Sequence, residues 1–168
     1  RVSKLHELAA YAKRFHVALI PEQQSFAHMH NTLKIEKYAH LAALPHAFLL
    51  SPNVAGSNAY LKRLIEQELA AVPHPPFFHI GSDETSTLGQ GKTATYVAQV
   101  GRSKAYADHI VAMNALIAPS GARTMLWDDG IENDPAIMTM LPKSVVIVNW
   151  HYGAIKSFQK YIDLVAKG

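Results

Sequence analysis

Cysteine is absent from the 168 residues of this chain, which excludes disulfide bonds and every mechanism that needs a thiolate. Charged residues make up only 17% of the sequence and apolar residues 49%, a balance typical of an ordered globular protein. The formal net charge is +3, and the lysines and arginines are scattered along the sequence. Because no basic block is present, we expect no nucleic-acid partner.

Long apolar runs are missing as well. No run approaches the roughly 20 residues that cross a bilayer, so we expect no membrane segment. The sequence opens inside a predicted helix and a targeting segment could precede it, so both a cytoplasmic and a secreted or periplasmic location stay open. No Gly-x-Gly-x-x-Gly separates a strand from a helix, which removes the main signal for a dinucleotide, and we expect no cofactor. The oligomeric state is left open.

What the sequence does contain is a hydrophobic periodicity that predicts helices alternating with short, continuously apolar strands. Helices are expected over residues 2–15, 32–43, 59–71, 104–118, a short stretch from 135 and the last residues to about 167, and strands over 16–20, 77–80, 123–127 and 145–148. The first and last helices are expected to turn apolar faces inward, with Leu8 and Phe158 among them. The glycine-containing segment after Glu84 is expected to be a long loop. This alternation predicts a parallel α/β fold.

Polar or aromatic residues follow each predicted strand, at Glu22, at Asp83 and Glu84, at Trp127, and at Trp150. Functional groups gathered at the carboxyl ends of strands are typical of a (β/α)8 TIM barrel. Such a barrel needs about 250 residues and eight strands, whereas only four strands are predicted. We therefore expect residues 1–168 to form a single partial TIM-barrel domain of a longer protein.

The most informative stretch runs from Phe77 to Glu84, where an apolar strand leads directly into two adjacent carboxylates. Side chains alternate across a strand, so Asp83 and Glu84 point in different directions and cannot act as two equivalent acids. One can reach the reacting bond as a general acid or base, while the other positions a different part of the ligand.

Residues 79–84, His-Ile-Gly-Ser-Asp-Glu, resemble the His-x-Gly-Gly-Asp-Glu motif of family 20 glycoside hydrolases, the β-N-acetylhexosaminidases. Residues 21–28, with Pro-Glu at the start and His at the end, resemble the Pro-Glu-x-Asp-x-Pro-Gly-His segment of that family. Residues 127–129 and 149–150 resemble the tryptophan-bearing ends of its fifth and sixth strands. The order and spacing agree over nearly the whole chain, which by this resemblance supplies strands three to six of the barrel.

The resemblance implies substrate-assisted retaining hydrolysis, which removes a terminal β-linked N-acetylhexosamine. The 2-acetamido oxygen of the substrate attacks the anomeric carbon. Glu84 then protonates the leaving oxygen and later activates water, Asp83 orients the acetamido group, and His28 lies beside the acid. Two departures concern the segment that aims His28, because Gln24 replaces the usual Asp and residues 26–27 replace Pro-Gly.

The same resemblance implies a partner and a set of binding residues. The partner is a glycan or glycoside that contains N-acetylhexosamine, with no metal and no cofactor. Trp127 and Trp150 are expected to wall the sugar pocket, because apolar sugar faces stack on indole rings. The remaining candidates are hydroxyl ligands, namely Glu22, Asp128 and Tyr152.

Two alternatives stay open from the residues alone. Histidine is a common metal ligand, so His28 and His30 with Asp83 could build the site of a metal-dependent barrel hydrolase. The chain could also belong to a barrel that binds sugars without cleaving them. Inhibition by a chelator would favour the first alternative, and binding of an acetamido sugar without turnover the second.

Overall fold

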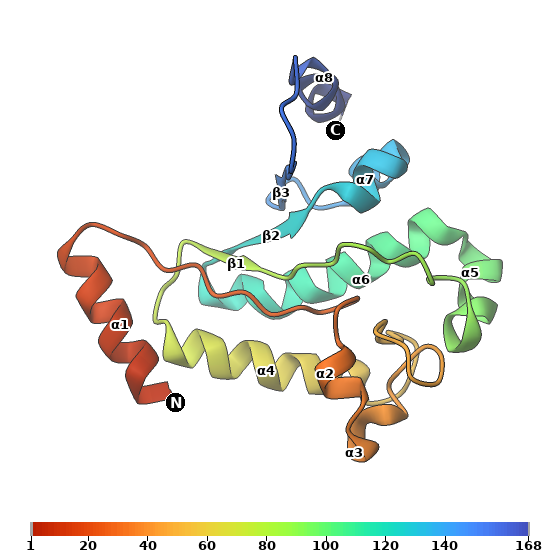
Figure 1. The fold of residues 1–168 in the computed structure, drawn as a ribbon, viewed down its shortest axis with the longest axis horizontal. Coiled ribbons are helices and arrows are strands. Elements are labelled where there is room, and N and C mark those ends of the chain that lie inside the picture. The colour runs from red at the N-terminus through yellow and green to blue at the C-terminus, as the bar shows by residue number, and fades with distance from the viewer. Residues whose placement is uncertain (1, 168) are drawn as a thin grey trace.

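The computed structural model describes residues 2–167, so Arg1 and Gly168 of the expected domain lie outside the described residues. Its centre is a parallel sheet in the order β1-β2-β3, built from β1 (Phe77–His79), β2 (Arg123–Trp127) and β3 (Val146–Val148) (Figure 1). Strands that follow one another in the sequence are direct neighbours, and the order never reverses. This arrangement matches a barrel segment and lacks the switch point of a doubly wound sheet.

Helices surround this sheet. They are α1 (Val2–Arg14), α2 (His30–Leu33), α3 (Glu36–Ala39), α4 (Ser57–Ala71), α5 (Ala94–Val100), α6 (Arg102–Ile117), α7 (Asp129–Asn133) and α8 (Gln159–Lys167), with 3-10 turns η1 (Gly91–Thr93), η2 (Ala118–Ser120) and η3 (Pro135–Met140). Helix α6 packs on β2 and on α4, and Figure 1 shows α4 and α6 running alongside the sheet.

The core lies between the sheet and these two helices. Ile110, Met113 and Ile117 recur at the three- and four-residue spacing that places them on one face of α6, and all three are fully buried. They share the core with fully buried residues of the sheet region and of α4, among them Phe26, Phe78, Ile80, Leu126, Leu61 and Ile65.

The expected strand over residues 16–20 is wrong, so the described chain has three strands and not four. The segment that follows it does run parallel to β1, with Glu22 opposite His79, His79 N–H donating to the Pro21 carbonyl at 2.9 Å and Gln23 N–H donating to that of His79 at 3.0 Å. In this register, residues 16–20 would face residues 73–77. Three of those, Pro73, Pro75 and Pro76, have no N–H to donate, so no ladder forms there.

Two further expectations need correction. The helix expected over residues 32–43 is divided into α2 and α3, because Ile35 between them has an extended backbone with ψ of 125°. The loop expected after Glu84 contains η1 and α5. The short helix from Pro135 is present as the 3-10 turn η3. Helices α1, α4, α6 and α8 and strands β1 to β3 otherwise lie where the periodicity places them.

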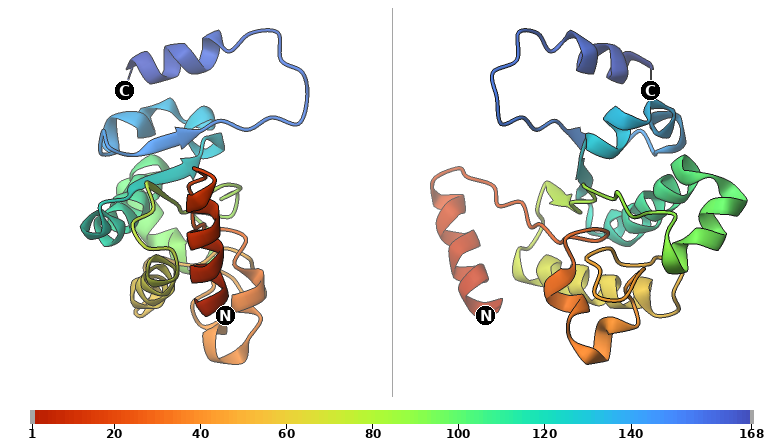
Figure 2. Two further views of the ribbon diagram at one scale, coloured as in Figure 1. Left: turned by 90° about the vertical axis from the view of Figure 1, so that its left-hand side faces the viewer. Right: turned by 45° about the vertical axis from the view of Figure 1, so that its right-hand side comes forward.

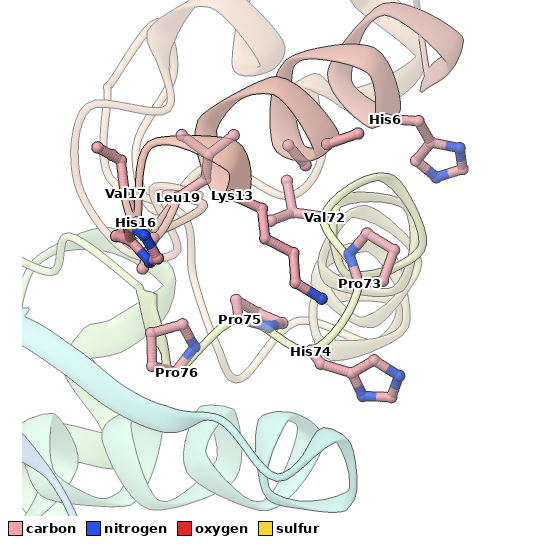
Figure 3. Close-up of a pocket in the computed structure, with 13 residues that line it drawn as sticks. His6, Lys13, His16, Val17, Leu19, Val72, Pro73, His74, Pro75 and Pro76 are labelled. Carbon is pink, nitrogen blue, oxygen red and sulfur yellow. The ribbon is translucent and has the colours of Figure 1, made fainter.

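Both ends of the chain lie at the periphery, where α1 rests on α4 and α8 on η3 (Figures 1 and 2). Their expected inward faces are not covered, since Leu8 is 50% exposed and Phe158, just before α8, is 56% exposed. Beside α1, a cavity of about 620 Å³ lies between the helix, residues 16–19 and the proline-rich residues 72–76, with Lys13 reaching into it (Figure 3). In residues 2–167, no helix has the length and apolar character needed to span a membrane.

Candidate active site

The chain leaves β1 through a turn with unusual backbone angles. Gly81, Ser82 and Glu84 have φ of 64°, 67° and 48°, in the left-handed region that residues other than glycine rarely adopt. A Cβ at Gly81 would also lie 2.0 Å from Oε1 of Gln24, so the Gln24 side chain would have to move. Asp83 and Glu84 therefore lie in an irregular turn and not in the regular strand, which ends at His79.

His28 lies between the two carboxylates. Its Nε2 is 3.2 Å from Oδ2 of Asp83 and 3.4 Å from Oε2 of Glu84. The two acids differ in access to solvent, since the Asp83 side chain is 15% exposed and that of Glu84 is 58% exposed. The structure therefore brings the three expected catalytic residues together, although they are 55 and 56 positions apart in the sequence.

Gln24 contacts the same carboxylate from the other side. Its Nε2 donates to Oδ1 of Asp83 at 3.2 Å, and its Oε1 accepts from the N–H of Ser82 at 3.3 Å. An aspartate at this position could not donate to Asp83, and two carboxylates would repel one another. The departure from the family motif thus places a neutral hydrogen-bond donor on Asp83 and fixes its orientation.

The next strand end adds two carboxylates with different environments. Oδ2 of Asp129 accepts from the backbone N–H of Glu84 at 2.8 Å. Burial raises the pKa of Asp129, the hydrogen bond from Glu84 opposes that rise, and the charge of Asp83 adds to it. Asp128 is 2% exposed, and its carboxylate accepts from the side-chain amide of Asn149 at the end of β3. Asp128 therefore links β2 to β3 in this chain.

Glu22 lies close enough to this group to respond to its charges. Partial burial raises its pKa, the negative charge of Asp83 raises it further, and His28 lowers it. A carboxyl group that keeps its proton more easily can both donate to and accept from a sugar hydroxyl.

The aromatic candidates lie on the two following strands. The ring of Trp127 is 4.3 Å from that of His79, measured between centroids, and the rings of Trp150 and Tyr152 are 5.2 Å apart. Tyr152 is 98% exposed, whereas Trp127 and Trp150 are half-buried. The Nδ1 atom of His79 accepts from the N–H of Gly81 at 3.0 Å, and burial lowers the pKa of His79, so this histidine braces the turn as a neutral ring.

Of the three residues of the metal alternative, His28 and Asp83 lie together and His30 does not. His30 is exposed at the start of α2, while His28 faces the carboxylates. Across the described residues 2–167, no group of three or more His, Cys, Asp or Glu side chains is arranged to hold a metal ion.

Several residues around the carboxylates were not predicted from the sequence. They are Asp129, which binds the backbone of Glu84, and a buried group beneath the turn consisting of Ser25, Ser82, Tyr106 and His109. The pair of acids after β2 was the available signal for Asp129. Tyr106 and His109 are three residues apart on a helix, where this spacing indicates only that they share a face.

Comparison with known proteins identifies the family. A model of the catalytic domain of glycosyl hydrolase family 20 matches residues 2–167. The chain belongs to this family. Within curated proteins, hexosaminidase D of Bos taurus is 32% identical over 168 residues, covering 90% of this chain and 46% of that relative. The chain spans less than half the length of the curated relatives it matches.

Solved structures of family 20 proteins share the fold. The exo β-N-acetylglucosaminidase from Vibrio harveyi, determined with N-acetylglucosamine, superposes with a TM-score of 0.76 at 17% identity, covering 99% of this chain and 27% of that chain. The β-N-acetylhexosaminidase from Bacteroides fragilis gives 0.75 at 17% identity, covering 99% and 33%. The chain is thus part of a family 20 TIM-barrel domain, which explains sequential parallel strands that do not close on themselves.

Proposed function

We propose that this chain carries the acid/base part of the active site of a glycoside hydrolase, which removes terminal β-linked N-acetylhexosamine from glycans. The whole enzyme is a longer protein, in which further strands complete the barrel. The observation that carries the proposal is the position of His28 between Asp83 and Glu84. This contact brings together two motifs of a family 20 chain that are distant in the sequence.

The proposed reaction is the substrate-assisted one that the resemblance to family 20 implies. The acetamido oxygen of the substrate attacks the anomeric carbon, and the bond to the leaving oxygen breaks as Glu84 transfers its proton to that oxygen. The resulting oxazolinium intermediate is opened by water, whose proton returns to the Glu84 carboxylate. Two displacements at the same carbon retain the configuration.

Exposure supports this division of roles. Glu84 is the accessible acid, at 58%, and can reach both a departing aglycone and an incoming water molecule. Asp83 is shielded and held by Gln24 and His28. A fixed carboxylate can accept the acetamido N–H, which makes the acetamido oxygen more nucleophilic and stabilises the positive charge that develops.

The surrounding residues are proposed to bind the sugar. Trp127 and Trp150 supply indole faces for the ring and the acetamido methyl group. Glu22, Asp128 and Tyr152 are proposed to contact hydroxyl groups. Of these, Asp128 already binds Asn149, so its second oxygen is the one that would accept from a hydroxyl.

Hydrolysis of an aryl β-N-acetylglucosaminide by the full-length protein tests the proposal. Glu84→Gln should lower kcat by about 10²- to 10⁴-fold, the usual contribution of a general acid, and azide should restore turnover of an activated substrate. Asp83→Asn should also lower kcat. Glu66→Gln, at an exposed ion pair on α4, is the matched control and should keep the wild-type rate.

Each alternative function gives a different result. Activity that Glu84→Gln leaves intact would contradict the proposal, and activity lost to a chelator would favour a metal-dependent hydrolase. Binding of N-acetylglucosamine by a wild-type protein that hydrolyses nothing would indicate a sugar-binding barrel.

A further inference from the structure

A group of four polar side chains lies beneath the turn that carries the carboxylates. Ser25 and Ser82 have no solvent exposure, and Tyr106 and His109 on α6 are each 2% exposed. None of the four is part of the reaction proposed above. Polar groups in a protein core are unfavourable unless they are hydrogen-bonded, so their bonds show what this group does.

The bonds converge on the turn. The hydroxyl of Tyr106 donates to the carbonyl of Ser82 at 2.8 Å, and the hydroxyl of Ser25 donates to the carbonyl of Ile80 at 2.9 Å. Oγ of Ser25 also lies 3.1 Å from Oγ of Ser82 and 3.2 Å from Nε2 of His109. Tyr106 and Ser25 therefore bind Ser82 and Ile80, which lie on either side of Gly81 just before Asp83, and His109 binds Ser25.

The direction of the histidine bond can be assigned. Ser25 has one hydroxyl hydrogen and uses it on Ile80, so its oxygen accepts from its other neighbours. Burial lowers the pKa of His109 to about 3, which leaves the ring neutral. Because the Ser25 oxygen accepts, the ring hydrogen is assigned to Nε2, the atom that faces it. His109 thus donates to Ser25, and Ser25 holds the strand end from which the turn begins.

The turn needs such support because its backbone is strained. Ser82 and Glu84 both have positive φ, a region that is strained for residues other than glycine. Such a conformation persists only where the surroundings enforce it. If Ser82 relaxed, the directions of Asp83 and Glu84 would change with it.

Space for the tyrosine hydroxyl is provided by a second element. A Cβ at Gly130 of α7 would lie 2.8 Å from the Tyr106 hydroxyl oxygen and 2.7 Å from its ring carbon. A glycine opposite the hydroxyl leaves room for it between α6 and α7. Helix α7 thus leaves room for the Tyr106 hydroxyl. This observation does not depend on the hydrogen bonds to the turn.

We propose that Tyr106 and His109 are positioning residues of the reaction, which hold Ser82 in the conformation that directs Asp83 and Glu84 into the site. Both residues are proposed to act through the turn and not on the substrate, because each is only 2% exposed. This inference rests on the proposed function, and it predicts a loss of rate with little change in substrate binding.

Tyr106→Phe in the full-length protein is the sharpest test, because it removes one hydroxyl and keeps the ring. Its kcat should fall about tenfold or more, as expected when reacting groups are displaced by a fraction of an ångström, while KM stays within about twofold. The fall should be larger for an alkyl than for a dinitrophenyl β-N-acetylglucosaminide, because only the alkyl leaving group needs the proton of Glu84. Tyr96→Phe, which removes a hydroxyl that binds Asp108 on α6, is the control and should leave both rates unchanged.

A second pair of variants covers the histidine. His109→Gln retains an amide N–H that can donate to Ser25 and should keep more of kcat than His109→Leu, measured at equal folded fraction by thermal melting. Equal rates in these two variants, or an equal fall on both substrates in Tyr106→Phe, would overturn the inference in favour of a purely structural role. So would a wild-type rate in Tyr106→Phe.

Failure of the proposed function gives a distinct result. A wild-type protein without hydrolase activity, or Glu84→Gln at the wild-type rate, would overturn the function and this inference with it. An active wild type whose rate depends on Glu84 but not on Tyr106 would overturn this inference alone.

Discussion

The centre and the two ends of this chain differ in how completely they bury their apolar side chains. Phe78 on β1 has no solvent exposure, whereas Phe158 before α8 is 56% exposed. Both residues fit apolar positions of a regular pattern, so the pattern alone does not distinguish them. The difference teaches that β1, β2, α4 and α6 form the core beneath the carboxylates, while α1 and α8 carry apolar side chains that the described residues leave exposed.

The two ends of the strands also differ in chemistry. At the carboxyl ends, Asp83, Glu84 and Asp129 lie around a strained turn and bind His28 or one another's backbone. At the amino ends, prolines and alanines line an apolar cavity beside α1. A barrel that confines its chemistry to one face can vary that face without disturbing the core.

The largest effect should come from the centre. Phe78→Ala should lower the free energy of unfolding of this chain by about 3–5 kcal/mol, because it removes a large side chain from a closed core and leaves a cavity. Phe158→Ala makes the same chemical change at an exposed position and should cost no more than about 0.5 kcal/mol. Urea denaturation of both variants measures the contrast, and equal losses would show that the ends are as well packed as the centre.

The pH dependence of stability should also arise from the centre, at the buried residue His109. Unfolded His109 takes up a proton near 6.5, but in the buried site it does so only near about 3. Between these values the unfolded state binds more protons, so stability falls as the pH drops, by at most about 1.4 kcal/mol per pH unit. His109→Gln should flatten the curve between pH 6.5 and 4.

Denaturation of the full-length protein across this range provides the measurement. His40→Gln is the control, because that histidine is exposed. Parallel curves for the wild type and His109→Gln would show that His109 does not supply this slope.

The sequence predicted much of the fold, for a physical reason visible at particular elements. Strand β2 has the expected bounds, Arg123–Trp127, because Gly121 with positive φ precedes it and the acidic pair Asp128 and Asp129 follows it. The strand expected over residues 16–20 looked equally apolar. It fails because its partner positions hold prolines, and pairing between segments 57 positions apart cannot be read from either segment alone.

The candidate site was predicted unevenly. Side-chain alternation predicted different roles for Asp83 and Glu84, and the resemblance to the family added His28, whose Nε2 lies within 3.4 Å of both carboxylates. Asp128 and Asp129 formed an equally plain pair, yet nothing in the sequence shows which one contacts Glu84. That choice depends on where β2 lies beside the turn.

Substitution of Asp129 should have an effect of intermediate size, between those of a core residue and an exposed residue. Asp129→Ala removes the acceptor of the Glu84 N–H and should lower kcat about tenfold, in line with the 1.5–3 kcal/mol of a hydrogen bond to a charged group. Asp129→Asn keeps an oxygen that can accept and should retain more activity than the alanine variant. Steady-state kinetics of the full-length protein decide this, with exposed Asp163→Ala on α8 as the control.

The order of the two variants matters more than the size of either loss. If Asp129→Asn is as slow as Asp129→Ala, the charge and not the hydrogen bond is what Glu84 requires. The prediction would then be wrong, although Asp129 would still act on the site.

The smallest effect is expected at the ends, and it sharpens the comparison between ends and centre. Leu8→Ser on α1 should change the stability of this chain by about 0.5 kcal/mol or less, because the side chain is already 50% exposed. In the proposed full-length protein the same substitution should cost about 1–3 kcal/mol, because further barrel elements would bury that face. Glu7→Ser, on the polar side of the same helix, should have little effect in either protein. If the cost of Leu8→Ser stays small in the longer protein, the exposed face of α1 faces solvent there too. The difference in burial between the ends and the centre would then hold in the longer protein as well.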